Sequence, residues 1–197
     1  MNYTIRCYVP ADESSWLRCR VLSFLGTSYY DDVLQAKPPI AAPGVELVAV
    51  DDEGTVVGLM DTVIENESAT IDTIAVHPDH QHQGLGRYLL EHTCSLARQR
   101  GARTLDAWTR DDADTLRWYR AVGFTESDHY LHVYASQYAS PEEPEHAIAA
   151  TRSGLRPVAA FFHASLDREQ QLRREFTRVH VCRRFAKSLP SPPRHLL

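Results

Sequence analysis

The chain has 197 residues and a formal net charge of −5 at pH 7, with 43% hydrophobic and 24% charged residues. These values suit one folded domain with a modest extension. They exclude a collagen-like or wholly disordered chain and a protein that is basic over its whole surface. The chain contains no run of about eighteen apolar residues that would predict a membrane span, and charged residues such as Asp12 and Arg18 interrupt its first 25 positions, so we expect a cytoplasmic protein without a signal peptide or membrane contact.

The first half of the chain predicts strands together with two helices. Apolar residues at every second position indicate the strands, and Asp12 can cap the first helix, which Gly26 ends. The acidic turn that ends in Gly54 is typical of a β-hairpin. The expected elements in this half are a strand at 2–9, helices at 12–26 and 28–35, and strands at 45–50, 55–64 and 69–76.

The second half predicts further helices and strands. Gly101 and Gly123 each follow a helical pattern and can end it. The whole pattern indicates an α+β fold, a mixed and largely antiparallel central sheet flanked by helices, with a C-terminal helix–strand extension. The expected elements are a helix at 84–100, a strand at 104–109, a helix at 112–122, strands at 124–135 and 158–163, a helix at 166–176 and a strand at 178–186.

Composition divides the chain into four parts. We predict a core at 1–136, an exposed loop or insertion at 137–156, a helix and strand at 157–187 that complete the sheet, and a flexible, proline-containing tail at 188–197. Residues 1–151 carry 11 lysines and arginines against 23 acidic residues, whereas the remainder carries 10 against 3. Because the basic end contains periodic apolar segments, we expect it to close against the acidic body rather than to bind nucleic acid.

The four cysteines show no metal-ligand spacing and are interpreted as small buried hydrophobes, so no metal site is expected. They are Cys7, Cys19, Cys94 and Cys182.

The most informative segment lies at 71–90, where a strand passes through a polar loop and a glycine pair into an amphipathic helix. Backbone N–H groups at such a helix start form an anion site, and Gly84 and Gly86 let a ligand approach closely. Arg87 can contact a phosphate or stay solvated. A Gly-x-Gly pair alone is weak evidence, because it also starts ordinary helices. The missing third glycine excludes a dinucleotide fingerprint, and the missing lysine excludes a P-loop.

Two motifs in order give the pattern its meaning. Gln81-x-x-Gly84-x-Gly86 after a strand, followed by Asp112-x-x-Thr115-x-x-x-Tyr119-x-x-x-Gly123-Phe124, resembles the GNAT superfamily of N-acetyltransferases over roughly 2–136. The resemblance implies acetyl-CoA as co-substrate and direct acetyl transfer to a primary amine of a small molecule or peptide. Asp112 stands where the family has asparagine, which removes one N–H donor. The residues that the resemblance places at the cofactor are Ile74, Ala75, Val76, Gln81, His82, Gln83, Gly84, Leu85, Gly86, Arg87 and Asp112.

The resemblance also implies catalytic residues. Tyr119 stands where the family has the tyrosine that protonates the leaving thiolate, although aromatic rings on helices often only pack. Asp72 lies in mid-strand and is predicted to act as base or amine anchor; the alternative is a buried structural carboxylate. Glu65 or Glu67 acting through a water molecule is a further alternative for the base.

The amine is expected to bind beside the first two predicted helices. There Tyr29, Tyr30 and Asp31 place aromatic rings next to an acid, which suits a cation; the alternative is that the local aromatic residues are core and the acids cap a helix. Two other functions stay open at this point, a non-catalytic acyl-CoA-binding sensor or interaction module and nucleic-acid binding by the basic end. A homodimer is possible.

Overall fold

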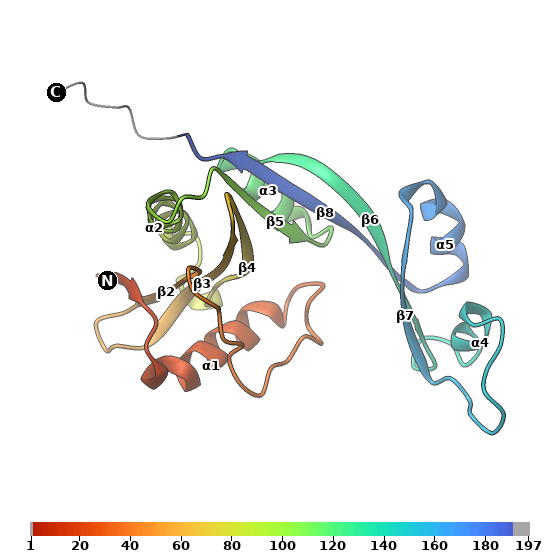
Figure 1. The fold of residues 1–197 in the computed structure, drawn as a ribbon. Helices are drawn as coiled ribbons and strands as arrows, with labels where there is room; N and C mark the ends of the chain where they lie inside the picture. Colours follow the sequence, from red (N-terminus) through yellow and green to blue (C-terminus); the bar gives the residue numbers. More distant parts are fainter. Residues whose placement is uncertain (1, 191–197) are drawn as a thin grey trace.

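The computed structural model describes residues 2–190, which form one mixed eight-stranded sheet with the strand order β1-β2-β3-β4-β5-β8-β6-β7 (Figure 1). Every neighbouring pair is antiparallel except β4 and β5, which run parallel. The expected α+β class and C-terminal extension are confirmed. The strands are β1 (Thr4–Cys7), β2 (Val45–Val50), β3 (Val56–Glu65), β4 (Ser68–Val76), β5 (Thr104–Thr109), β6 (Thr125–Ser136), β7 (Ala159–Ala164) and β8 (Arg178–Ser188).

Helices cover the sheet because its strands are apolar on both faces. The helices are α1 (Glu13–Phe24), α2 (Leu85–Gln99), α3 (Ala113–Ala121), α4 (Glu143–Ala147) and α5 (Glu169–Glu175). Successive residues of a strand point to opposite faces. Val48 therefore packs in a cluster with Trp16 of α1, whereas Leu47 packs in another cluster with Leu89 of α2.

The sheet opens in the middle, between β4 and β5. Their parallel pairing covers only Ser68–Ile71 against Thr104–Ala107. The next residue, Asp72, is skipped in the register with β3, where Asp61 pairs with Thr73 and Thr62 pairs with Ile71. Such a bulge bends a strand. The end of β4 therefore turns away from β5, as Figure 1 shows, and this opening positions the site described below.

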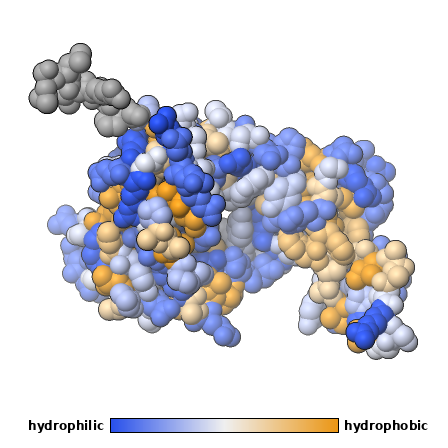
Figure 2. Space-filling view, in the orientation of Figure 1, coloured by the Kyte–Doolittle hydropathy of each residue, from blue (hydrophilic) through white to orange (hydrophobic). Residues whose placement is uncertain are grey.

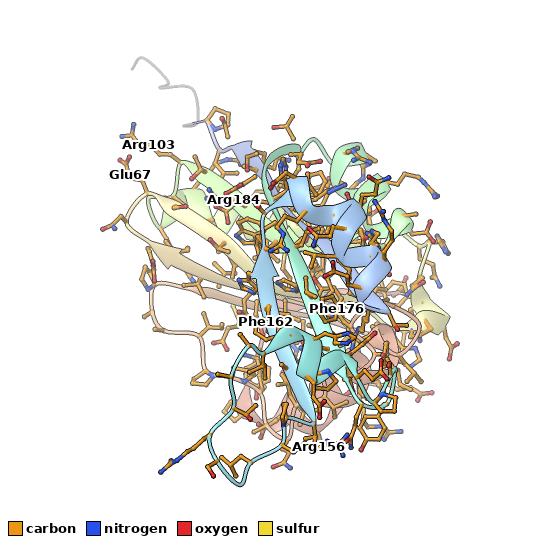
Figure 3. The ribbon with its side chains drawn as sticks, turned by 90° about the vertical axis from the view of Figure 1, so that its right-hand side faces the viewer. Glu67, Arg103, Arg156, Phe162, Phe176 and Arg184 are labelled. Atoms are coloured by element: carbon orange, nitrogen blue, oxygen red, sulfur yellow. The ribbon has the colours of Figure 1, made fainter. Side chains whose placement is uncertain are left out.

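The C-terminal part forms its own packed layer. Side chains of α5, β6 and β8 make a third apolar cluster that includes Leu172, Leu131 and Val181. Phe162 of β7 packs against this cluster, which contains Phe176; both are labelled in Figure 3. In the space-filling view, apolar surface gathers around β7 and α4 (Figure 2), where Phe161 and Leu155 are exposed.

Three expectations of local structure are wrong. Residues 28–35 form turns rather than a helix, because ion pairs with distant arginines fix their conformation. The segment 137–156 contains the short helix α4, and Glu143 in it is buried, since its carboxylate accepts a hydrogen bond from the Thr177 backbone N–H at 2.6 Å. Cys7 is exposed, while the other three cysteines are buried.

The end of the described chain belongs to the fold. Ser188 is the last residue of β8, and Leu189 is buried and donates its backbone N–H to the Arg103 carbonyl at 2.6 Å. These residues fall in the segment expected to be a flexible tail, which is wrong for them. The rest of that expectation, at 191–197, lies outside the described residues.

The basic end pairs with the acidic body, as the charge distribution predicts. Arg178 contacts Asp31 at 2.6 Å and Arg173 contacts Asp111 at 3.1 Å. Arg184, labelled in Figure 3, pairs with Asp106. Between residues 2 and 190, no helix is long and apolar enough to cross a membrane, and no group of three His, Cys, Asp or Glu side chains is placed to hold a metal ion.

Candidate active site

Two cavities meet at the opening between β4 and β5. The first has a volume of about 270 Å³ and lies toward α1, and the second has a volume of about 440 Å³ and lies toward α2 and α3. Both contact the same stretch of β4 and the same side of α3, so a molecule can extend from one into the other. The residues that line both cavities are Ile74, Ala75, Val76, Gln81, Thr115 and Tyr119.

The second cavity reaches the start of α2. Gly84 is the residue before the helix and has a φ of 83°, a left-handed conformation that favours glycine. A Cβ on Gly86 would lie 3.5 Å from the Trp118 ring, so a small residue leaves space in the cavity. The first amides of a helix have no partner within it, and the helix dipole favours an anion there. His82, Leu85 and Arg87 complete this part of the lining, an arrangement suited to phosphate.

Three of the residues expected at the cofactor are used in other contacts. The Gln83 side-chain oxygen accepts a hydrogen bond from the Tyr3 hydroxyl at 2.7 Å, and the Gln81 amide donates to the Val76 carbonyl at 3.1 Å. Asp112 accepts hydrogen bonds from the backbone N–H of Ser28 at 3.1 Å and from the Ser28 hydroxyl. Gln81 still lines both cavities. Among the described residues, Gln83 and Asp112 line neither.

Tyr119 combines the two interpretations that its sequence position allows. Its ring is 3% exposed and stacks on Phe185 at a centroid distance of 5.2 Å, with Phe124 and Trp118 at its edges. It also lines both cavities. Burial raises the pKa of the Tyr119 phenol above its ordinary value. The group therefore stays protonated at neutral pH and is fixed in one orientation.

Asp72 is exposed and lines the first cavity, at the bulge of β4. Its carboxylate accepts a hydrogen bond from the Thr73 hydroxyl at 3.1 Å. The alternative of a buried structural carboxylate is therefore wrong. Glu67 pairs with Arg103 at 2.9 Å beside the opposite end of β4 (Figure 3), and neither it nor Glu65 is among the residues that line these cavities.

The residues expected at the amine are separated by the structure. Tyr29 lines the first cavity, and its hydroxyl accepts a hydrogen bond from the Arg110 backbone N–H at 3.0 Å. Burial raises the pKa of this phenol. Tyr30 is exposed and lies under the Arg178 guanidinium, at 4.7 Å. Asp31 is already paired with Arg178, which lowers the pKa of its carboxyl, so this acid is not a free anchor for a cation.

Two charged groups near the first cavity escape the sequence patterns. Arg20 of α1 is 5% exposed, pairs with Asp32 at 2.8 Å, and lines the cavity with it. Asp61 of β3 is 1% exposed and lies 3.2 Å from the Lys37 ammonium. Burial raises the pKa of Asp61 to about 7. An acid inside the apolar run 56–64 is the signal that could have identified Asp61.

Comparisons with known proteins agree with this geometry. The model of the Acetyltransferase (GNAT) family matches residues 11–124. The ribosomal protein bS18-alanine N-acetyltransferase of Escherichia coli (strain K12) is 42% identical over 67 residues, which are 34% of this chain and 45% of that protein. The streptothricin acetyltransferase of Streptomyces lavendulae is 37% identical over 82 residues, 39% of this chain and 42% of that protein. The matched segments thus span less than half of these relatives.

Solved structures show the same fold. The ribosomal-protein-S18-alanine N-acetyltransferase from Escherichia coli has a TM-score of 0.60 at 18% identity, covering 100% of this chain and 99% of that one. A Salmonella typhimurium acetyltransferase solved with acetyl-CoA has a TM-score of 0.56 at 17% identity, covering 98% and 96%. Since the family model matches more than half of the residues, the chain belongs to the GNAT family of acetyltransferases.

Proposed function

We propose that the protein transfers the acetyl group of acetyl-CoA directly to a primary amine of a small molecule or peptide. The observation that carries this proposal is the junction of the two cavities beside Tyr119, with an anion-suited helix start in one and the Asp72 carboxylate in the other. A thioester at the junction would face an amine in the first cavity. The family relationship supports acetyl-CoA as the donor.

The cofactor would lie along the second cavity. Its pyrophosphate would sit at the start of α2, near Gly84, Leu85 and Gly86, and its pantetheine arm would follow β4 from Val76 toward Ile74. The parallel pairing with β5 ends at Ile71, so this part of β4 presents an edge without a β5 partner, where an amide-containing arm can form hydrogen bonds.

The first step is loss of a proton from the amine. A lysine-like ammonium with a pKa near 10.4 costs about 4.6 kcal/mol to deprotonate at pH 7. Asp72 lines the acceptor cavity and would accept this proton directly or through water, or hold the ammonium before reaction. The amine nitrogen then bonds to the acetyl carbon, and the carbon–sulfur bond breaks.

The leaving thiolate must then gain a proton. The Tyr119 hydroxyl would supply it, and the tyrosinate would regain a proton from solvent through the cavities. An ordinary phenol is a weaker acid than an ordinary thiol by roughly 2 kcal/mol. Loss of water around the thiolate raises its affinity for the proton and reduces this difference.

The acceptor class rests on the relatives. One relative is named for an alanine of a ribosomal protein and another for streptothricin, so we propose a peptide or small-molecule amine for this chain. Cytoplasmic location, a homodimer and the division at residue 136 remain predictions of the same kind.

A thiol-release assay with acetyl-CoA and a panel of amines and peptides tests the proposal. We expect turnover with at least one acceptor class and a loss of turnover in Asp72→Asn, with Glu67→Gln, outside the cavities, as control. Binding of acetyl-CoA without turnover on any acceptor would favour the non-catalytic binding module. Salt-dependent nucleic-acid binding that is lost when 152–197 are deleted would favour the basic-end alternative.

A further inference from the structure

A third cavity, of about 450 Å³, continues the cofactor side of the site. It shares Arg87, Ala121 and Val122 with the second cavity, so the two form one groove between α2 and α3. The groove runs from the glycine pair at the start of α2 toward the last turn of that helix. Its lining is Arg87, Leu90, Glu91, Cys94 and Arg98 of α2, Ala121, Val122 and Gly123 at the end of α3, and Lys187 of β8.

The third cavity is positively charged. Arg87, Arg98 and Lys187 line it against a single acid, Glu91. Within residues 2–190, these three cations form no ion pair with a carboxylate, whereas other arginines of the basic end, such as Arg178, do. Three like charges around one hollow repel one another unless an anion lies between them.

The cations are held close to the hollow. The Lys187 ammonium donates a hydrogen bond to the Val122 carbonyl at 2.8 Å and lies 5.1 Å from the centre of the Phe124 ring. Lys187 and Arg98 both act on the buried thiol of Cys94 and oppose the rise in its pKa that burial causes. The charges of α2 and β8 thus converge on the same point of the cavity.

We propose that the third cavity binds the 3′-phosphate of the adenosine in acetyl-CoA. The inference rests on the proposed function, because it takes acetyl-CoA as the ligand of the second cavity. Besides its pyrophosphate, acetyl-CoA carries one phosphate monoester, on the ribose. Eight residues of α2 separate Gly86 from Cys94, a rise of about 12 Å, which is comparable to the reach of a nucleoside.

The chemistry of the lining fits this group. A phosphate monoester carries between one and two negative charges near neutral pH and three acceptor oxygens. Arg98 offers a planar guanidinium and Lys187 a compact ammonium, which bind phosphate by charge-assisted hydrogen bonds. A ligand that lacks the 3′-phosphate leaves these cations unpaired, so the site discriminates acetyl-CoA from its 3′-dephospho form.

Calorimetric titration of the full chain with CoA and with 3′-dephospho-CoA tests the inference. We expect the wild type to bind CoA about tenfold to a hundredfold more tightly than 3′-dephospho-CoA. Arg98→Ala should lose most of this difference by weakening CoA binding alone. Lys187→Gln should act in the same direction. Arg100→Ala is the matched control, because it removes the same charge from the next turn of chain, outside the cavity lining.

The outcomes separate this inference from the proposed function. Equal affinity of the wild type for the two ligands would overturn the 3′-phosphate site and leave acetyl-CoA binding intact. Equal weakening of both ligands by Arg98→Ala, or an identical effect of Arg100→Ala, would also overturn it. Failure of the wild type to bind either ligand would overturn the proposed function itself.

Discussion

The guanidinium of Arg178 donates two hydrogen bonds to the Asp31 carboxylate, at 2.6 and 2.9 Å, and a third to the Ser28 carbonyl at 3.0 Å. Arg178 is the first residue of β8, and its partners lie in the turns that follow α1. The same turns place Tyr29 in the first cavity. The C-terminal part of the chain therefore holds one wall of the acceptor cavity in place.

Removal of this contact should affect the acceptor more than the donor. We expect Arg178→Ala to raise the KM for the amine by about threefold to tenfold, because the loop with Tyr29 becomes mobile, and to leave the KM for acetyl-CoA unchanged. The pair is partly exposed, so the free energy of unfolding should fall by only about 1 kcal/mol. Steady-state kinetics with each substrate varied measures both constants.

Arg156→Ala is the control for Arg178, since Arg156 pairs with Glu145 at 3.5 Å on the surface near α4 (Figure 3). Neither residue of that pair lines the two main cavities. An unchanged KM for the amine in Arg178→Ala would show that the loop keeps its position without the ion pair.

Loss of the Tyr119 hydroxyl should separate chemistry from binding. In Tyr119→Phe the ring keeps its stack on Phe185, so the fold and the affinity for acetyl-CoA should change little. Turnover should fall by about a hundredfold or more, as expected for a lost proton donor. Equilibrium titration with acetyl-CoA and the rate of thiol release provide the two readouts. A rate equal to that of the wild type would reduce Tyr119 to a packing residue.

A carboxylate at the start of α2 should exclude phosphate. Gly84→Glu adds bulk and negative charge where the helix start favours an anion, and we expect acetyl-CoA binding to weaken by at least about tenfold. Gly84 has a left-handed φ of 83°, so any side chain also strains the backbone. Gly54→Glu provides the control, because Gly54 has a φ of 81° in a hairpin turn away from the cavities. Similar binding in the two variants would remove phosphate from the Gly84 loop.

Asp61 should make stability depend on pH. Its carboxyl has an ordinary pKa of 3.8, and burial raises this pKa to about 7 in the folded protein. Between these values the folded protein holds a proton that the unfolded chain has released, so this group's contribution to the free energy of unfolding is present below about pH 4 and falls as the pH rises toward about 7. Urea unfolding of the wild type and Asp61→Asn across this range measures the effect. Parallel profiles would show that Asp61 titrates as in the unfolded chain.

Local patterns were sufficient for most of the fold. The apolar alternation at 45–50, the glycine-ended helix at 84–100 and the strand at 178–186 each specify an element whose energetics are dominated by its own residues and turns. Residues 28–35 show the limit of this approach. Their sequence permits a helix, but Arg178 and Arg20 are distant in the chain and only the folded sheet brings them to Asp31 and Asp32.

The sequence by itself determined the family pattern, the glycine-containing start of α2 and the position of Tyr119 on α3, because short-range spacing encodes them. Only the tertiary structure decided which side chains share a cavity. The bulge at Asp72 turns that side chain into the first cavity, while the contact with Ser28 keeps Asp112 out of the cofactor side. The physical reason is that a strand register and a long-range hydrogen bond depend on partners far apart in the chain, and no local pattern carries that information.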